Sequence, residues 1–524
     1  MSGDVWRPKH NPWLITIVAS LAAFMEVLDT SIANVALPHI AGTLGTSNDE
    51  STWVLTSYLV SNAIVLPVSG WLVSVVGRKR FFMVSILVFT VSSFFCGIAS
   101  SLAVLLVSRV LQGGAGGGLQ PMAQAILADT FPPAKRGTAF ALYGITAVMA
   151  PIVGPTLGGW ITDNYSWRWI FLINIPVGVL ALLLVQNLIE DPPYLTRTTT
   201  ARARFDYLGF SLLALGVGAL QIMLDRGQQD DWFGSRFITT LAVVSGLCLV
   251  ALMFYEWFRD APIVDVRLFQ NINFLSASAL MLMLGAVFFS SLVMLPQFLQ
   301  TLMGYTAETT GRALSASGLV TLIAMPIVGQ LTTRVQARWL IALGWGATAL
   351  AMSYSAQHLD LLISFGAAAW LRIAQVAGVA LLFVPITLAA YVGLPTERSN
   401  NAAGLINFMR NIGSGIGTSM VTTLIARRAQ FHQVHLVSRV ASDNPAFQDQ
   451  IKGLAQRLAD SGLGTYEAQR EAYARVYRVV RDQAQTLAFI DMYWLLAAAA
   501  AVMVAVAFTL RKNDPRLGGQ VIAH

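Results

Sequence analysis

The stretch SRVLQGGAGGGLQPM, residues 108–122, returns in altered form as LRIAQVAGVALLFVP, residues 371–385. Each stretch places an arginine three residues before a glutamine inside an apolar run, and the two arginines, Arg109 and Arg372, lie 263 residues apart. Ionisable residues are rare inside apolar runs of this length, because lipid cannot solvate them. The match therefore indicates an internal repeat in a membrane protein.

Two further pairs of segments extend this repeat. FPPAKRG at 131–137 corresponds to LPTERSN at 394–400, and GWLVSVVGRKR from Gly70 corresponds to GQLTTRVQARW from Gly329. The corresponding segments run in the same direction, so the repeat is parallel. The pattern predicts two six-helix halves related by a pseudo-twofold axis, an arrangement in which a transporter holds its substrate site near the midplane between the halves.

The composition excludes a water-soluble fold. Hydrophobic residues make up 55% of the 524 residues, charged residues make up 12%, and the mean hydropathy is +0.62. A soluble domain usually carries about 25% charged residues. A surface with so little charge is suited to lipid, and the natural solvent of most of this chain is the bilayer.

Fourteen apolar runs are long enough to cross a hydrocarbon core, which needs about 20 residues of helix. They predict an all-α integral membrane protein with both chain ends on the same side. The runs are 13–38, 51–73, 81–99, 103–128, 138–161, 169–189, 206–225, 236–258, 274–299, 313–333, 338–356, 363–390, 402–425 and 487–510.

The repeat and the runs together define the expected domains. We expect an N-terminal six-helix bundle over residues 1–190 and a linker with two extra spans over residues 191–270. A C-terminal six-helix bundle follows over residues 271–524 and includes a helical external segment at 426–486.

The basic residues orient the spans. The formal net charge is +7, and with both termini in the cytoplasm eighteen Lys and Arg residues fall in cytoplasmic segments but only four in short external loops. Cytoplasmic loops of membrane proteins carry this excess. The basic charge therefore indicates membrane topology, and we expect no nucleic-acid partner.

Seven motifs make the chain resemble a known family. Together they are similar to the fourteen-span drug:proton antiporter branch of the major facilitator superfamily, and most similar to its EmrB-type members. The motifs are LDTSIANVALP (28–38), GWLVSVVGRKR (70–80), SRVLQGGAGGG (108–118), GITAVMAPIVGPTLGG (144–159), WRWIFLINIPVG (167–178), LDRGQQDDWF (224–233) and FMRNIGSGIGTS (408–419).

The resemblance implies a major facilitator fold and a function. It implies proton-coupled efflux of drugs and toxic lipophilic compounds across the bacterial inner membrane by alternating access. The partners it implies are membrane lipids, small-molecule drugs, protons, a periplasmic membrane-fusion adaptor and, through the adaptor, an outer-membrane channel. Two alternatives stay open: a dedicated exporter of one aromatic acid or siderophore, and a membrane scaffold or receptor that does not transport.

The sequence carries no pattern typical of enzymatic or ATP-driven chemistry. The glycines at 113–118 are not followed by the Gly-Lys-Ser/Thr ending of a phosphate-binding loop. The histidines lack metal-ligand spacing. We therefore expect a protein without enzymatic activity, metal or cofactor, for which the proton gradient is the energy source.

Two carboxylates and one arginine are the candidates for proton coupling. Glu26 and Asp29 are three residues apart in the first span, so they share a helix face. With a rise of about 1.5 Å per residue, Glu26 and Arg109 both lie about 10 Å below the outer face of the membrane. We predict that one carboxylate pairs with Arg109, and we favour Asp29 because it belongs to the family motif. A permanent ion pair that locks the two spans is the alternative.

Other polar residues inside spans are candidates for the substrate cavity. Arg410 could contact substrate, or it could instead bind backbone carbonyls of neighbouring helices. Gln297, beside Pro296, could also contact substrate, or it could form a hydrogen bond between helices. The full set of cavity candidates is Asn34, Gln112, Gln297, Arg372, Asn407, Arg410 and Asn411.

A third set of residues is expected to control conformational change. The loop after the second span departs from the family pattern, since Ser74 stands where an aspartate is usual, but its glycines and basic residues are present. In the fifth span, glycines allow close helix approach and proline bends the helix. The candidates are Gly70, Gly77, Arg78, Gly154, Pro155, Gly158 and Gly159.

The external segment 426–486 contains an amphipathic pattern. Apolar residues from Tyr466 to Leu487 recur at three-, four- and seven-residue spacing, opposite Arg470, Arg475 and Arg478. A helix of this kind requires a partner surface. A lid on the transporter itself is one possibility, and the family resemblance implies docking to the periplasmic adaptor.

Overall fold

A computed structural model describes residues 8–192, 206–260, 262–395, 398–438, 440 and 445–512. In these ranges the chain is helical, and it contains no strand. The predicted linker lies partly outside them, and so do the two chain ends that the topology prediction places in the cytoplasm.

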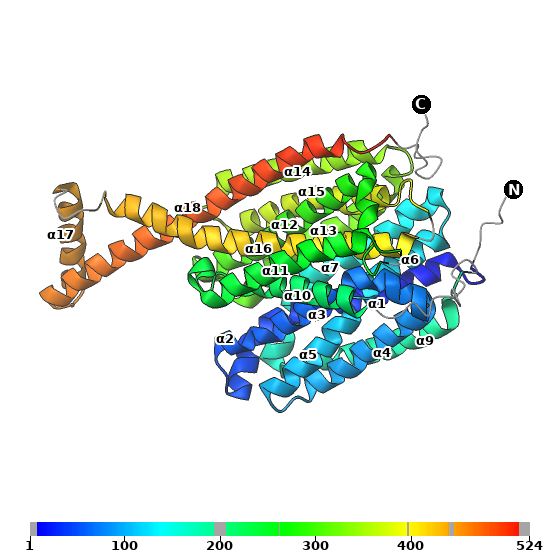
Figure 1. The fold of residues 1–524 in the computed structure, drawn as a ribbon. Coiled ribbons are helices and arrows are strands. Elements are labelled where there is room, and N and C mark those ends of the chain that lie inside the picture. The colour runs from blue at the N-terminus through cyan, green and yellow to red at the C-terminus, as the bar shows by residue number, and fades with distance from the viewer. Residues whose placement is uncertain are drawn as a thin grey trace.

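The first half of the chain forms a bundle at the lower side of Figure 1, coloured blue to cyan. Its helices pack through α1 on α7, α3 on α5 and α4 on α9. They are α1 (Pro12–Leu44), the short α2 (Asn48–Ser51), α3 (Trp53–Val76), α4 (Arg78–Gly97), α5 (Leu102–Gly116), α6 (Leu119–Thr130), α7 (Pro133–Asn164), α8 (Trp169–Leu172) and α9 (Asn174–Leu188).

The second half forms the other bundle, green to red in Figure 1. Here α12 packs on α16, α14 on α15 and α18, and α13 on α15. The helices are α12 (Ile272–Thr301), α13 (Ala307–Leu331), α14 (Ala337–His358), α15 (Phe365–Ala390), α16 (Ser399–Val437), α17 (Pro445–Asp460) and α18 (Thr465–Ala507). The two predicted six-helix bundles are thus present.

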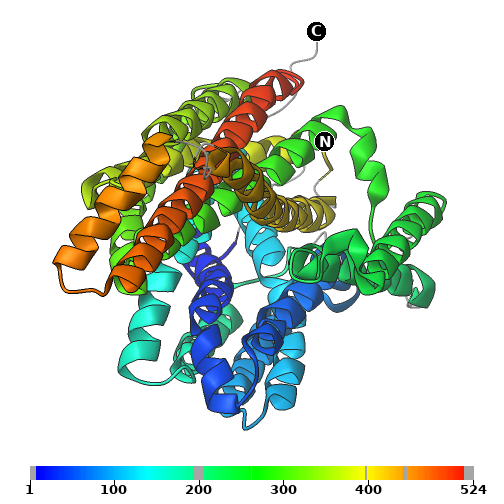
Figure 2. The same cartoon turned by 90° about the vertical axis from the view of Figure 1, so that its left-hand side faces the viewer.

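Two helices lie outside both bundles. They are α10 (Tyr207–Arg226) and α11 (Arg236–Trp257), joined through the short η2 (Trp232–Gly234). They pack on each other, and α10 also contacts α3 of the first half and α16 of the second. In Figure 2 this pair stands to one side of the molecule. A second short helix, η3 (Val266–Gln270), leads from them into α12.

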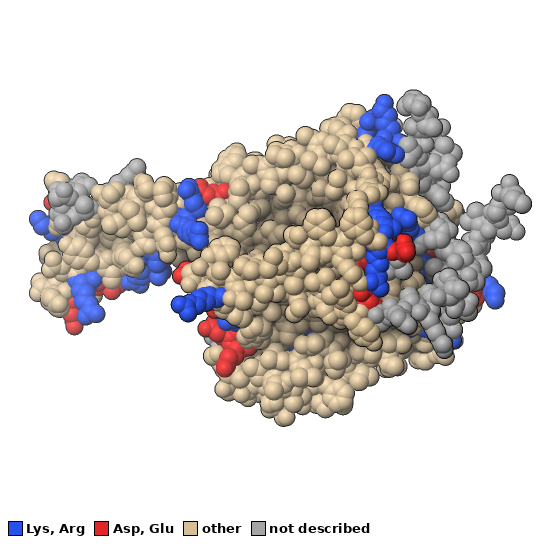
Figure 3. Space-filling view, in the orientation of Figure 1, with Lys and Arg blue, Asp and Glu red and all other residues tan. Residues whose placement is uncertain are grey.

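The surface confirms a multi-pass membrane protein. Charged side chains gather at the two ends of the body and on its projecting arm, and a nearly uncharged band lies between them (Figure 3). Twelve of the described helices are long and apolar enough to cross a bilayer. The two other predicted spans, 338–356 and 402–425, lie in α14 and α16. These two helices are not among the twelve that are long and apolar enough. The number fourteen stays a prediction.

The glycine run of the fourth span breaks it into α5 and α6. A Cβ on Gly113 would lie 2.3 Å from the Tyr58 carbonyl oxygen, and one on Gly117 would lie 2.7 Å from that of Asn62. These glycines let the α5–α6 pair approach the backbone of α3. The glycine run is therefore a close helix contact.

The external segment is not a separate loop but is built largely from the ends of α16 and α18. α16 and α18 run without interruption out of the body, and α17 packs on α18 at their far end. Together they form an arm, made of the described residues 426–438, 440 and 445–486, that projects away from the rest of the molecule (Figure 1). Because α16 and α18 continue into it, the arm is a helical extension of the second half.

Candidate functional site: an ion pair and a carboxylate-lined cavity

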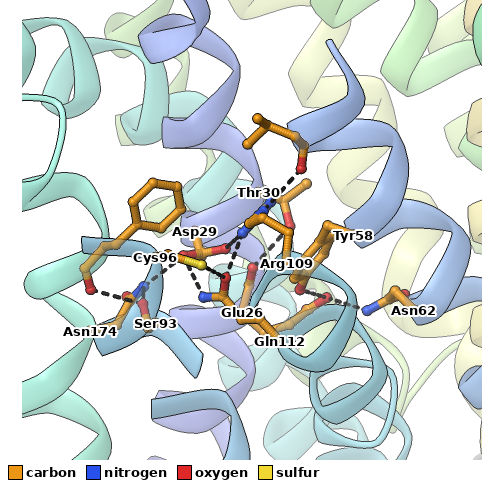
Figure 4. Close-up of polar contacts among 12 residues, drawn as sticks. Glu26, Asp29, Thr30, Tyr58, Asn62, Ser93, Cys96, Arg109, Gln112 and Asn174 are labelled. Carbon is orange, nitrogen blue, oxygen red and sulfur yellow. Dashed lines mark hydrogen bonds and ion pairs between the residues drawn. The ribbon is translucent and has the colours of Figure 1, made fainter. Parts of the chain in front are cut away.

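A buried ion pair joins α1 to α5. Asp29 Oδ2 lies 2.6 Å from Arg109 Nη1, and neither side chain is exposed. The other Asp29 oxygen accepts hydrogen bonds from Gln112 at 3.0 Å and from Asn174 at 2.7 Å. These groups come from α1, α5 and α9, and Figure 4 shows them converging. The carboxylate is fully enclosed by donors.

The guanidinium of Arg109 has further contacts. Its Nε donates to the Val54 carbonyl oxygen at 3.1 Å, and its Nη1 also donates to Gln112 Oε1 at 2.8 Å. Its carbon lies 4.2 Å from the centre of the Tyr58 ring, while its Nη2 has no hydrogen-bond partner among the described residues. The contacts of Arg109 connect α1, α3 and α5.

Glu26 lies three residues earlier on α1 and has other partners. Its Oε1 accepts hydrogen bonds from the Tyr58 hydroxyl at 3.2 Å and from Asn62 Nδ2 at 3.1 Å, and its Oε2 accepts one from Gln120 Nε2 at 2.5 Å. Tyr58 and Asn62 belong to α3, and Gln120 to α6. Glu26 is not the partner of Arg109.

A cavity of about 870 Å³ lies between the two halves of the molecule. Glu26, Tyr58 and Gln120 line it from the first half, together with Asn34. From the second half it is lined by aromatic and polar side chains, namely Phe288, Phe289, Gln297, Phe383, Arg410 and Asn411. It is a mostly apolar site with a few converging polar groups, which is typical of small-molecule binding.

Hydrogen bonds connect the two halves at this cavity. Gln120 Oε1 accepts from Arg410 Nη2, so Gln120 bridges Glu26 and Arg410. Asn411 Nδ2 donates to Asn62 Oδ1 at 3.0 Å. One intervening side chain therefore links each carboxylate oxygen of Glu26 to α16. Asn62 links Oε1 to Asn411, and Gln120 links Oε2 to Arg410.

Nearby, Gln124 and Asn407 form a reciprocal pair across the same boundary, at 3.2 and 2.9 Å.

The cavity extends to the end of the molecule that carries the arm. Pro38 and His39 near the end of α1, Asp163 near the end of α7 and Gln300 near the end of α12 line it. At the opposite end the halves touch. A Cβ on Gly70 would lie 2.8 Å from the Asn401 Cα, and one on Gly137 would lie 2.8 Å from the Gly329 carbonyl oxygen. The molecule is open at one end and closed at the other.

The predicted cavity residues divide into two groups. Asn34, Gln297, Arg410 and Asn411 line the cavity. Gln112 lies beside the Asp29–Arg109 pair, and Asn407 lies in the contact with Gln124. Neither lines the cavity, and Arg372 does not line it either.

The predicted conformational residues lie at helix contacts. Cβ atoms on Gly154 and Gly158 would meet Ser31 and Ile32 of α1, and Pro155 and Gly159 line the cavity. Gly77 adopts a positive φ of 92° between α3 and α4.

Arg78, at the start of α4, forms an ion pair of 2.5 Å with Asp129 at the end of α6. Both side chains are buried at the closed end of the molecule.

Sequence reasoning did not single out several residues of the site. They are Tyr58, Asn62 and Gln120 around Glu26, Asn174 beside Asp29, and Asp129 beside Arg78. Asn62, Gln120 and Asn174 carry the signal that identified Arg109, a polar residue inside an apolar span. Gln120 even lies within the repeated stretch, so the same criterion applied evenly would have found it.

Known proteins match both the sequence and the fold. The family model described as Major Facilitator Superfamily matches residues 19–418. Multidrug export protein EmrB of Escherichia coli (strain K12) is 38% identical over 511 residues, which are 98% of each chain. EmrB of Haemophilus influenzae is 37% identical over 485 residues, 92% of each chain.

Among solved structures, the proton:xylose symporter XylE has the same fold. Its TM-score is 0.62 at 13% identity, over 98% of this chain and 97% of that one. The two bundles, the matched sequence and the relatives agree. This chain belongs to the major facilitator superfamily, in the branch of the EmrB-type multidrug export proteins.

Proposed function

We propose that this chain exports lipophilic drugs and toxic compounds in exchange for protons, by alternating access. The observation that carries the proposal is the placement of Glu26, a buried carboxylate that lines the cavity between the halves and reaches α16 through Gln120. The proton gradient is the energy source, and transport requires neither a cofactor nor enzymatic activity. The names of the EmrB relatives support the same class of substrate.

We propose Glu26 as the proton-coupling carboxylate, in place of the Asp29 that the motif favoured. A coupling group must exchange its proton with water on either side of the membrane, and Glu26 faces the cavity. Asp29 is enclosed by Arg109, Gln112 and Asn174 and does not line it. The Asp29–Arg109 pair then corresponds to the permanent ion pair that was the alternative.

Protonation of Glu26 would change the contact between the halves. The carboxylate accepts three hydrogen bonds and attracts Arg410 through Gln120. A proton removes the negative charge and turns one oxygen into a donor, which weakens that attraction. A substrate in the cavity meets the same polar groups, so proton and substrate compete for one site.

The orientation is part of the proposal. With the termini in the cytoplasm and the chain in the bacterial inner membrane, the arm lies in the periplasm and the cavity opens on the periplasmic side. The contacts of Gly70 and Gly137 then close the cytoplasmic side. This is the state in which substrate leaves and a proton enters.

Dye efflux from inverted membrane vesicles tests the function. Vesicles with the chain should move lipophilic dyes when a proton gradient is applied, and an uncoupler should stop the movement. If only one aromatic acid or siderophore moves, the chain is a dedicated exporter. If no compound in a broad panel moves with the gradient, the scaffold reading is correct and the proposal is wrong.

We also propose that the arm docks a periplasmic membrane-fusion adaptor, which would connect to an outer-membrane channel. The arm projects from the body, so it does not cover the cavity as a lid would (Figure 1). Its buried face consists of small residues such as Ala468, Ala472 and Ala484, whereas Tyr466 and Tyr477 are 79% and 55% exposed. Exposed tyrosines on a rigid helix are well suited to protein contacts.

Deleting residues 430–485 should abolish capture of a co-expressed adaptor while the chain still inserts in the membrane. The deletion keeps the pair between Arg428 and Asp491 at the base of the arm, 2.6 Å apart. Pull-down from detergent extracts measures capture, and replacing Tyr466, Tyr473 and Tyr477 by alanine is the milder companion change. Undiminished capture by the deleted chain would rule out docking through the arm.

A further inference from the structure

The second half contains a buried arginine, Arg372, that forms no ion pair with any carboxylate in the described part of the chain. Arg372 of α15 is 0% exposed. Its Nη1 donates to Ser291 Oγ at 3.1 Å and to Gln375 Oε1 at 3.2 Å, and its guanidinium lies 5.6 Å from the Phe288 ring. Its Nε and Nη2 are buried and have no hydrogen-bond partner in the described part of the chain. Two strong donors are left unsatisfied.

The internal repeat shows what is missing. Arg109 and Arg372 both stand seven residues after the first residue of their helix, and each donates to the glutamine three residues later. In the first half the other partners are the Val54 carbonyl oxygen and the Asp29 carboxylate, which supplies the negative charge. In the second half that place is taken by Ser291 of α12, a neutral hydroxyl. The second copy has kept the cation and lost the anion.

Four helices of this half, α12, α14, α15 and α16, carry no acidic side chain. On α18, Asp491 is taken by Arg428 at 2.6 Å and His432 at 2.7 Å. An isolated charge in a low-dielectric interior destabilises the fold when nothing compensates it. A compensating ligand would stabilise the fold.

The free groups around Arg372 are donors. Tyr493 of α18 is fully buried and faces Arg372 and Gln375, and its hydroxyl has no geometrically sound partner among the described residues. Ser291 already donates to the Phe288 carbonyl oxygen at 2.8 Å. A buried cluster of unsatisfied donors around a full positive charge selects an anion.

We propose that the second half binds one small monovalent anion, chloride, at Arg372 between α12, α15 and α18. The anion takes the place that the Asp29 carboxylate has at Arg109. One guanidinium balances one negative charge, which selects a monovalent ion. Full burial between packed helices selects a small one. Arg372 does not line the cavity, although its neighbour Phe288 does, and the inference does not depend on the proposed export activity.

Chloride should therefore stabilise the purified protein in a saturable way. A ligand that binds the native state alone raises the stability with the logarithm of its concentration. We expect Tm, measured by intrinsic fluorescence at constant ionic strength, to rise by several degrees as chloride replaces gluconate. Binding of radioactive chloride at one ion per chain is the direct measurement.

Two substitutions of one residue make the test specific. Ser291→Asp supplies the missing carboxylate from within, so it should abolish chloride binding and the chloride response, and its Tm in gluconate should match or exceed that of the natural chain in chloride. Ser291→Asn, of nearly equal size but neutral, should keep some chloride response. The proposal is overturned if the natural chain shows no saturable response, or if its response survives Ser291→Asp.

Discussion

Glu26→Gln is expected to reduce proton-driven export to the background of vesicles that lack the protein, while the chain remains folded and able to bind substrate. The glutamine keeps the size of the side chain and an acceptor oxygen for Gln120, but it cannot gain or lose a proton. Because Glu26 is a buried carboxylate in the cavity wall, its loss should remove the coupling and not the cavity itself.

Two measurements separate coupling from binding. Counterflow of labelled substrate between the two sides of the membrane needs no proton gradient, so it should persist in the Glu26→Gln chain. Release of protons on addition of substrate to the purified protein, followed with a pH-sensitive dye, should disappear. Glu26→Asp keeps a titratable group and should retain part of the export.

Uncoupler-sensitive export by the Glu26→Gln chain would show that another group carries the proton. Asp29 would then be the next candidate, as the family motif suggested. The experiment therefore decides between the two carboxylates, which the sequence places on one face of α1.

The internal repeat explains why so much of the fold was predictable. Arg109 and Arg372 occur at a fixed offset, and a charged residue inside an apolar run is costly enough to be a reliable marker. Depth along the helix also predicted correctly that a carboxylate of α1 meets Arg109. Both inferences use distances along the chain, which a sequence states directly.

The identity of that carboxylate was also right, but its neighbours were not accessible to sequence reasoning. Glu26 and Asp29 differ by 60° around the helix, and that rotation separates an enclosed ion pair from a cavity wall. Only the packing of α3 and α6 against α1 shows that Tyr58, Asn62 and Gln120 surround Glu26. The side chains that meet a given face of a helix depend on which other helices pack against that face, and the sequence does not state this directly.

The arm shows the same limit in another form. The periodicity found a helix between Tyr466 and Leu487, and it placed the tyrosines on the same apolar face as Val480 and Ala484. In the structure the covered positions are Ala468, Ala472, Val480 and Ala484, spaced by four or eight residues, and Tyr466 and Tyr477 are exposed. Alanine allows two helices to pack closely, and a hydrophobicity pattern gives it too little weight.

Asp29→Asn is expected to lower the free energy of unfolding by about 3–5 kcal/mol, the usual cost of breaking a buried ion pair by removing one partner. The asparagine has nearly the same shape, but Arg109 would keep its charge with no compensation. Gln112 and Asn174 donate to one Asp29 oxygen and Arg109 to the other, so the amide N–H of the asparagine would face a donor in either orientation. Unfolding in mixed micelles with increasing denaturing detergent measures the loss.

Combining Asp29→Asn with Arg109→Gln distinguishes a structural pair from a coupling pair. If the pair is structural, the double change should recover a large part of the stability that either single change removes, because no buried charge is left alone. The double variant should then still export in a gradient-dependent way, since Glu26 is intact. Recovery of stability without any recovery of proton-driven export would instead place Asp29 and Arg109 in the coupling machinery. Asp29 would then be the proton-coupling carboxylate of α1, and the role proposed for Glu26 would be wrong.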